Sequence, residues 1–104
     1  MSHHTLRIST EQFDEQMVIR LDGRVAGPWA TELVRVWTES AATLDRRKTT
    51  IDIRNVTYVD EQGKNILRDI YDQTQAELLA STPWTRYLAE EVMRNSANHS
   101  KEEL

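Results

Sequence analysis

The chain has 104 residues, no cysteine and a formal net charge of −4. This length suits one domain that buries roughly 60% of its unfolded surface, and the lack of cysteine excludes disulfides, thiol catalysis and thiolate metal sites. The acidic balance argues against a nucleic-acid surface, and no apolar run approaches the ~20 residues of a membrane span. No secretory signal precedes the first strand, so a cytoplasmic protein is expected.

Two short strands are the first predicted elements. Leu6 and Ile8 alternate with polar residues, and a polar turn over residues 10–15 leads to a second apolar segment, Met17 to Leu21. The short connection makes these strands antiparallel neighbours. The adjacent His3 and His4 before them are too few to close a metal site.

The first predicted helix begins at Pro28, because proline at the first helical position loses no needed hydrogen bond. The helix is expected to run to about Thr43, with Trp29, Leu33, Val36 and Trp37 along one apolar stripe. Gly23 and Gly27 precede it without the lysine of a GxxxxGK[ST] phosphate loop, so no such loop is predicted.

Residues 48–60 combine a predicted central strand with an ordered loop. The segment from Thr49 to Ile53 is rich in β-branched residues, which is typical of a buried strand, and Asp52 marks its less buried face. Residues 55–60 are predicted to form a loop in which Val56 and Val59 turn inward.

A second predicted helix begins at Asp60, since Ile66, Leu67 and Ile70 follow at helical spacing. The Asp60 carboxylate can cap the first turn and meets the positive end of the helix dipole. Gly63 in that turn indicates either a close approach to the backbone or a glycine that fits under a neighbouring side chain.

The end of the chain predicts a short strand over residues 77–80 and a final helix from Pro83, capped by Thr82. Residues 95–104 hold too few apolar side chains to offset the conformational entropy that the segment would lose on folding. We therefore expect a single domain over residues 1–94 and a flexible polar tail over residues 95–104. The order of strands and helices predicts an α/β sandwich with largely parallel strands and an antiparallel first strand.

The stretch IDIRNVTYVDEQGKNIL, from Ile51 to Leu67, resembles the STAS domains of sulphate transporters and anti-sigma factor antagonists. Those domains carry a hydrophobic strand, a short loop and an Asp-x-x-Gly turn that opens a helix. The resemblance extends more weakly to VIRLDGRV, from Val18 to Val25, and to ELLASTPWTRYLAEEV, from Glu77 to Val92. It implies a mixed sheet of four to five strands covered by three or four helices.

One residue departs from the regulatory members of this family. The third residue of their Asp-x-x-Gly turn is usually a serine or threonine that a partner kinase phosphorylates, and here it is Gln62. An amide has no hydroxyl to phosphorylate, and the neighbouring Glu61 lacks the second charge of a phosphate. Both a permanently unswitched binder and one controlled in another way remain open.

Catalytic and cofactor sites are not expected. The three histidines lie in the terminal segments, and HExxH and GxSxG do not occur. Asp52, Asp60 and Glu61 could hold a divalent ion only if they converged, and strand alternation and the capping role scatter them. No enzyme activity, metal or cofactor is therefore predicted.

A protein-binding module is the favoured function, with an anti-sigma factor antagonist-like role in transcription implied by the resemblance. The partner would be a kinase-type anti-sigma factor or a transporter subunit, and the chain could also form a homodimer. The alternative function is a STAS subunit of an ABC-type lipid or anion transporter complex. A nucleotide at the helix N-terminus is a weaker alternative, because the two carboxylates there repel phosphate. The expected partner-binding residues are Arg24, Asp60, Glu61, Gln62, Gly63, Lys64, Asn65 and Arg68, with Lys64 and Arg68 on the solvent side.

Overall fold

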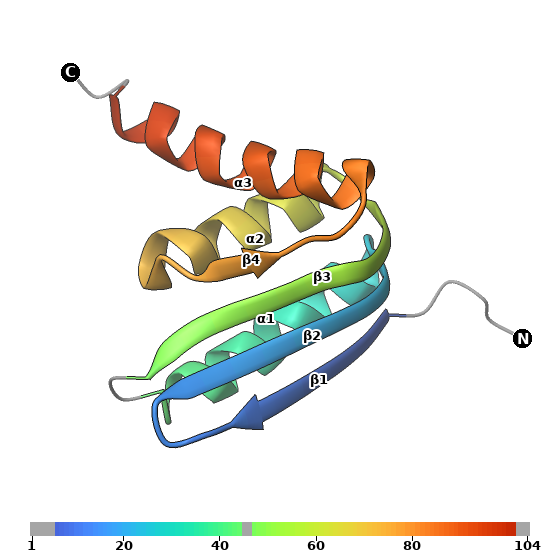
Figure 1. Cartoon of the computed structure of the whole chain (residues 1–104). Coiled ribbons are helices and arrows are strands. Elements are labelled where there is room, and N and C mark those ends of the chain that lie inside the picture. Colours follow the sequence, from blue (N-terminus) through green and yellow to red (C-terminus); the bar gives the residue numbers. More distant parts are fainter. Residues whose placement is uncertain (1–5, 45–46, 102–104) are drawn as a thin grey trace, which may run out of the picture.

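The computed structural model describes residues 6–44 and 47–101, with side chains described as far as residue 94. The elements, in chain order, are β1 (Leu6–Gln12), β2 (Gln16–Val25), α1 (Pro28–Ala41), β3 (Lys48–Val59), α2 (Glu61–Thr74), β4 (Glu77–Leu79) and α3 (Pro83–Lys101). This order confirms the predicted alternation of strands and helices (Figure 1).

The described strands form one four-stranded sheet in the order β1-β2-β3-β4. β1 is antiparallel to β2, and a tight turn joins them, in which the Phe13 N–H donates to the Gln16 carbonyl at 2.7 Å. β3 runs parallel to β2, and β4 runs parallel to β3, because a helix returns the chain after each of these strands. The predicted mixed α/β sandwich is confirmed.

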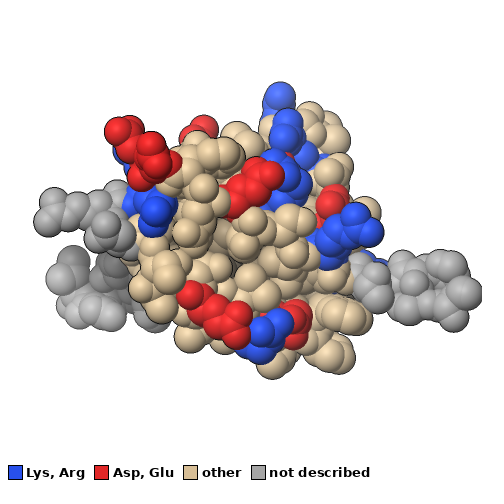
Figure 2. Space-filling model, turned by 90° about the horizontal axis from the view of Figure 1, so that it is seen from below, with Lys and Arg blue, Asp and Glu red and all other residues tan. Residues whose placement is uncertain are grey.

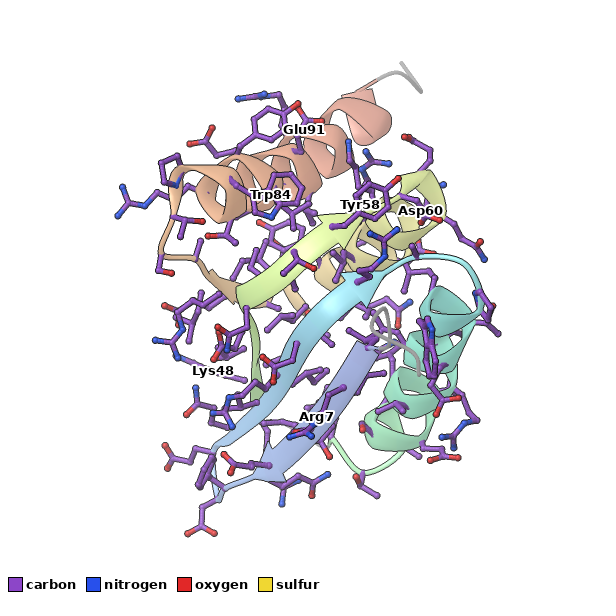
Figure 3. The ribbon with its side chains drawn as sticks, turned by 90° about the vertical axis from the view of Figure 1, so that its right-hand side faces the viewer. Arg7, Lys48, Tyr58, Asp60, Trp84 and Glu91 are labelled. Carbon is purple, nitrogen blue, oxygen red and sulfur yellow. The ribbon has the colours of Figure 1, made fainter. Side chains whose placement is uncertain are left out.

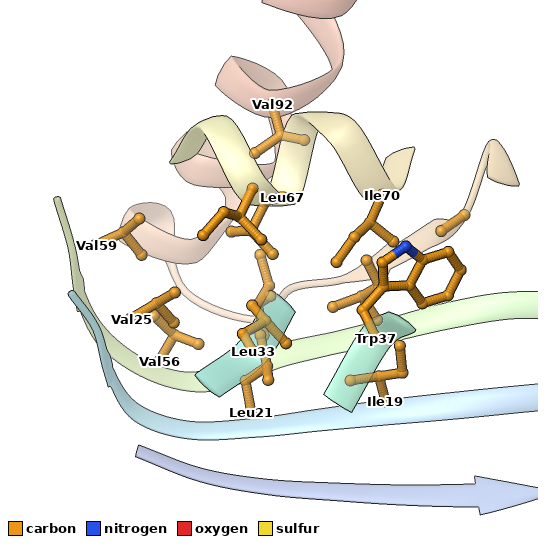
Figure 4. Packing of buried hydrophobic residues seen from close by; sticks show 14 of the residues in the cluster. Ile19, Leu21, Val25, Leu33, Trp37, Val56, Val59, Leu67, Ile70 and Val92 are labelled. Atoms are coloured by element: carbon orange, nitrogen blue, oxygen red, sulfur yellow. The ribbon is translucent and has the colours of Figure 1, made fainter. Parts of the chain in front are cut away.

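The hydrophobic core lies between the sheet and the helices (Figures 1 and 4). α1 and α2 pack over one face of the sheet, and α3 packs along α2. The strands supply Ile19, Leu21, Val25, Ile51 and Ile53, and the helices supply Leu33, Trp37, Leu67, Ile70, Leu88 and Val92. The apolar faces predicted for the strands and for the helices thus pack against each other in one core.

β3 is longer than predicted, which corrects the expected loop over residues 55–60. Its pairing with β2 continues to Val25 opposite Val59, across two shifts of register. Val56 and Val59 are buried as expected, but they are three residues apart, so the irregular pairing breaks the alternation that marks a regular strand. β2 likewise extends to Val25, beyond the predicted end at Leu21.

Asp52 is buried on the face of the sheet opposite the helices, and only 2% of the residue is exposed. Arg54 holds its carboxylate with two side-chain hydrogen bonds, at 2.9 and 2.8 Å, and Arg20 adds a third at 3.3 Å. The side-chain hydrogen bond from Arg54 is the main reason why the pKa of Asp52 falls from 3.8 to about 2. Arg20 and Arg54 therefore cover Asp52 on the face of the sheet that was predicted to be less buried.

This lowered pKa predicts acid sensitivity. Because the folded-state pKa lies below the unfolded value, the stabilisation is complete above pH ~4 and is lost as the pH falls toward ~2. Arg54 is half exposed to water, so we expect about 1–2 kcal/mol from the group after allowing for screening. The free energies of unfolding of the wild type and Asp52→Asn in urea should differ most at pH 7, and the difference should shrink steadily as the pH falls from about 4 toward about 2. A difference that stays constant with pH would contradict this, and Asp22→Asn on β2 serves as the control.

The final helix begins as predicted, since the Thr82 hydroxyl accepts a hydrogen bond from the Thr85 N–H at 3.1 Å. α3 then runs to Lys101, past the point where the sequence analysis ended it. No proline or glycine interrupts the segment after Arg94, so nothing local ends the helix. The division into a domain over 1–94 and a polar tail stays a prediction.

Candidate functional site

The Asp60 side chain connects, through hydrogen bonds, the segments that follow the two central strands β2 and β3. Its Oδ1 accepts a hydrogen bond from the Gly63 N–H at 2.8 Å, which confirms the predicted cap of α2. Its Oδ2 accepts a second hydrogen bond from the Gly27 N–H at 3.1 Å, at the start of α1. The carboxylate therefore fixes the β2–α1 loop and the first turn of α2 to each other.

Gly63 lies directly against the end of β2. A Cβ atom at this position would stand 2.2 Å from the Val25 carbonyl oxygen and 2.9 Å from Cγ1 of Val59. The same Val25 carbonyl accepts a hydrogen bond from the Asp60 N–H at 3.3 Å. Of the two explanations for this glycine, the close approach of the backbone is the one that the structure shows.

Asp60→Ala should lower the free energy of unfolding by about 2 kcal/mol, at the upper end of the range for N-cap residues. The variant removes the acceptor of two backbone N–H groups instead of one. Thermal and urea unfolding measure the effect, with Asp69→Ala on the exposed side of the same helix as control. A loss below about 0.5 kcal/mol would contradict the double role of the carboxylate.

The first two turns of α2 present a small polar surface. Glu61, Gln62 and Asn65 are exposed, as expected for partner-binding residues. Lys64 and Arg68 are half-buried, which corrects their predicted place on the solvent side. They lie one turn apart on the flank of the helix, between its buried stripe and its exposed face.

Arg68 is held close to the helix. One of its guanidinium nitrogens donates to the Asn65 side-chain oxygen at 2.6 Å, and its Nε is buried with no partner among the described residues. The exposed face of α2 carries Glu61, Asp69 and Asp72 instead. The solvent face of this helix is thus more acidic than the sequence analysis expected.

Tyr58 adds an aromatic side chain that the sequence analysis did not assign to the site. It is 43% exposed at the end of β3, beside Asp60 (Figure 3). The Arg24 guanidinium lies 4.5 Å from the centre of its ring, a cation–π contact between neighbouring strands. The register that pairs Arg24 with Tyr58 brings them together, and only the parallel pairing of β2 and β3 could have revealed it.

We define the Asp60 surface as Arg24, Tyr58, Glu61, Gln62 and Asn65, held together by the Asp60 hydrogen bonds. Its charges are mixed, with one arginine and one glutamate. Lys, Arg, Asp and Glu are also interspersed on the face seen in Figure 2. Such a surface can offer hydrogen bonds, a stacked aromatic ring and single charges to a partner, which is typical of protein recognition.

Metal binding and membrane insertion would each need a particular feature among the described residues. No group of three or more His, Cys, Asp or Glu side chains in this part of the chain comes close enough to hold a metal ion. None of the helices described here is long and apolar enough to cross a membrane.

Comparison with known proteins gives a likeness in structure alone. No protein-family model and no curated protein matches the chain. An anti-sigma factor antagonist from Mycobacterium paratuberculosis superposes with a TM-score of 0.76 at 18% identity, covering 93% of this chain and 85% of that one. The anti-sigma factor antagonist SpoIIAA in its unphosphorylated form gives a TM-score of 0.63 at 17% identity, covering 88% and 84%. The chain therefore has the fold of anti-sigma factor antagonists, as the STAS resemblance implied.

Proposed function

We propose that this chain is a protein-binding module of STAS type, an anti-sigma factor antagonist-like regulator of transcription whose partner is a kinase-type anti-sigma factor. The observation that carries the proposal is the double hydrogen bond of Asp60 to Gly63 and Gly27. These hydrogen bonds fix the β2–α1 loop and the first turn of α2 into one surface, and a surface held in place before binding loses little conformational freedom when a partner docks. The likeness to two anti-sigma factor antagonists supports the choice of partner.

A protein partner suits this site better than a nucleotide. The N–H of Gly63 in the first turn of α2 already donates to Asp60, so it is not free to bind a phosphate. Glu61 adds a further negative charge at the same helix end. Phosphate binding there would have to overcome both carboxylates.

Because residue 62 is a glutamine, phosphorylation at the position that is usual in STAS regulators cannot switch the proposed binder. The Gln62 side chain is exposed in the first turn of α2, where a partner kinase could reach it, but an amide offers no hydroxyl for phosphotransfer. The interaction would then be controlled by the amount of protein or of partner. After incubation with the partner and ATP, the intact mass of the chain should be unchanged.

The binding test uses the same substitution at two places on one helix. Gln62→Arg adds a long cation within the Asp60 surface, and Gln73→Arg adds the same side chain on an exposed position near the other end of α2. With each kinase-type anti-sigma factor of the source genome immobilised in turn, we expect Gln62→Arg to raise the Kd at least tenfold, or about 1.4 kcal/mol.

Gln73→Arg should leave the Kd within twofold of the wild type, and both variants should keep its melting temperature, since exposed substitutions usually change stability by about 0.5 kcal/mol or less. Equal affinity of the wild type and both variants would refute the Asp60 surface. Binding to none of these anti-sigma factors would refute the proposed partner class.

A further inference from the structure

The outer edge of β1 pairs with no other strand among the described residues. β1 stands first in the sheet order, with β2 on one side only, and Figure 1 shows it as the outermost strand. Its seven residues pair with β2 without a shift of register, and they include no proline. β4, at the other edge of the sheet, has only three residues. A regular edge strand of this length is a template for pairing with a further strand.

The backbone groups that β1 presents at this edge follow from its pairing with β2. Opposite residues of an antiparallel pair alternate between hydrogen-bonded and non-hydrogen-bonded pairs. The Phe13 N–H donates to the Gln16 carbonyl, so the next pair in the register, Gln12 with Met17, is a non-hydrogen-bonded one. Every second residue along the rest of β1 then bonds β2. The N–H and C=O groups that point outward belong to the others, which are Leu6, Ile8, Thr10 and Gln12.

These outward groups match those of a second β1. When two copies lie antiparallel with Ser9 opposite Ser9, Ile8 of each copy faces Thr10 of the other, and Leu6 faces Gln12. These are the residues whose N–H and C=O groups point outward, so each pair can exchange two hydrogen bonds. All seven residues of β1 take part. A shift by one residue would place outward-pointing groups opposite inward-pointing ones, which excludes it.

The same alignment joins opposite charges. Arg7 of each copy stands opposite Glu11 of the other, on the face of the sheet away from the helices. Both side chains are exposed, and Arg7 makes no ion pair within the described part of the chain. Glu11 reaches only Arg20, at 3.9 Å. Moving one copy by two residues in either direction separates Arg7 from Glu11, so the charges favour a single register.

We propose that the chain forms a homodimer in which β1 pairs antiparallel with β1 of a second copy, in register about Ser9. The two sheets continue as one, and the helices of both copies lie on the same side. The interface uses the same patch of each copy, so every substitution in it acts twice. The Asp60 surface does not include β1, and Figure 3 shows Arg7 apart from Tyr58 and Asp60. The dimer therefore leaves that surface open and does not depend on the partner proposed above.

A charge exchange tests the register. Sedimentation velocity of the full chain over a concentration series measures the Kd of the dimer. Arg7→Glu and Glu11→Arg should each raise this Kd at least tenfold, because each places like charges opposite one another at both ends of the interface. The two substitutions together should return the Kd to within threefold of the wild type. Glu90→Arg makes the same charge change on exposed α3 and should leave the Kd within twofold.

Thr10→Pro tests the backbone pairing. Proline removes the outward N–H of Thr10, and an edge strand tolerates it where that N–H faces solvent, so the variant should fold as a monomer that does not dimerise. Thr10→Ala keeps the N–H and should keep the Kd within threefold. A wild type that is monomeric at every concentration, or a Thr10→Pro variant with the Kd of the wild type, would overturn the proposal. It would also be overturned if the single charge reversals weakened the dimer no more than Glu90→Arg, or if the exchanged pair stayed as weak as the single variants.

Discussion

Ile53→Ala should lower the free energy of unfolding by about 2–5 kcal/mol, the range for removing a large aliphatic side chain from a packed core. Ile53 is fully buried in β3, which has β2 on one side and β4 on the other. The helices close over this face of the sheet, so the neighbouring side chains have little room to fill the space that alanine leaves.

Urea unfolding at neutral pH measures this effect. Val34→Ala is a suitable control, because it also shortens an aliphatic side chain but at a position that is 42% exposed on α1. We expect the control to change the free energy of unfolding by less than about 0.5 kcal/mol. A loss below about 1 kcal/mol for Ile53→Ala would show that β3 does not lie at the centre of the core.

Gly63→Ala should destabilise the fold by about 3 kcal/mol, although alanine is the better helix former by about 1 kcal/mol. The added methyl group would meet the Val25 carbonyl at 2.2 Å, and backbone atoms cannot move aside as the end of a flexible side chain can. To relieve the clash, α2 must shift away from the end of β2, which would also stretch the hydrogen bonds of Asp60.

The matched control is Gln62→Ala, in the same helical turn but exposed. Helix propensity alone predicts that both alanine variants keep or raise stability, whereas the close approach predicts a loss only at residue 63. Thermal unfolding of the two variants distinguishes these outcomes. A Gly63→Ala variant as stable as the wild type would mean that α2 does not pack against the Val25 carbonyl.

The sequence was sufficient to predict features that depend on residues close to one another in the chain. The proline at the start of α1, the cap of α2 by Asp60 and the cap of α3 by Thr82 were all predicted from local patterns, and each is confirmed. The same holds for the order of the elements and for the antiparallel first strand, because loop length and helical crossovers determine the strand directions.

Contacts between distant segments of the chain could not be predicted from the sequence. The hydrogen bond from Gly27 to Asp60 and the stacking of Arg24 on Tyr58 each join residues more than 30 positions apart. Both depend on the shifted register of β2 and β3, which no local pattern encodes. The half-burial of Lys64 and Arg68 was missed because helical spacing locates the centre of the buried stripe but not its width.

Chemical-shift mapping of the isotope-labelled chain with a kinase-type anti-sigma factor tests the central claim most directly. The proposal predicts that the amide signals of residues 24–27 and 58–65 shift or broaden on binding, while those of residues 48–50 and 73–77 at the other end of the sheet stay unchanged. Changes confined to residues 48–50 and 73–77, with the Asp60 surface unaffected, would contradict it.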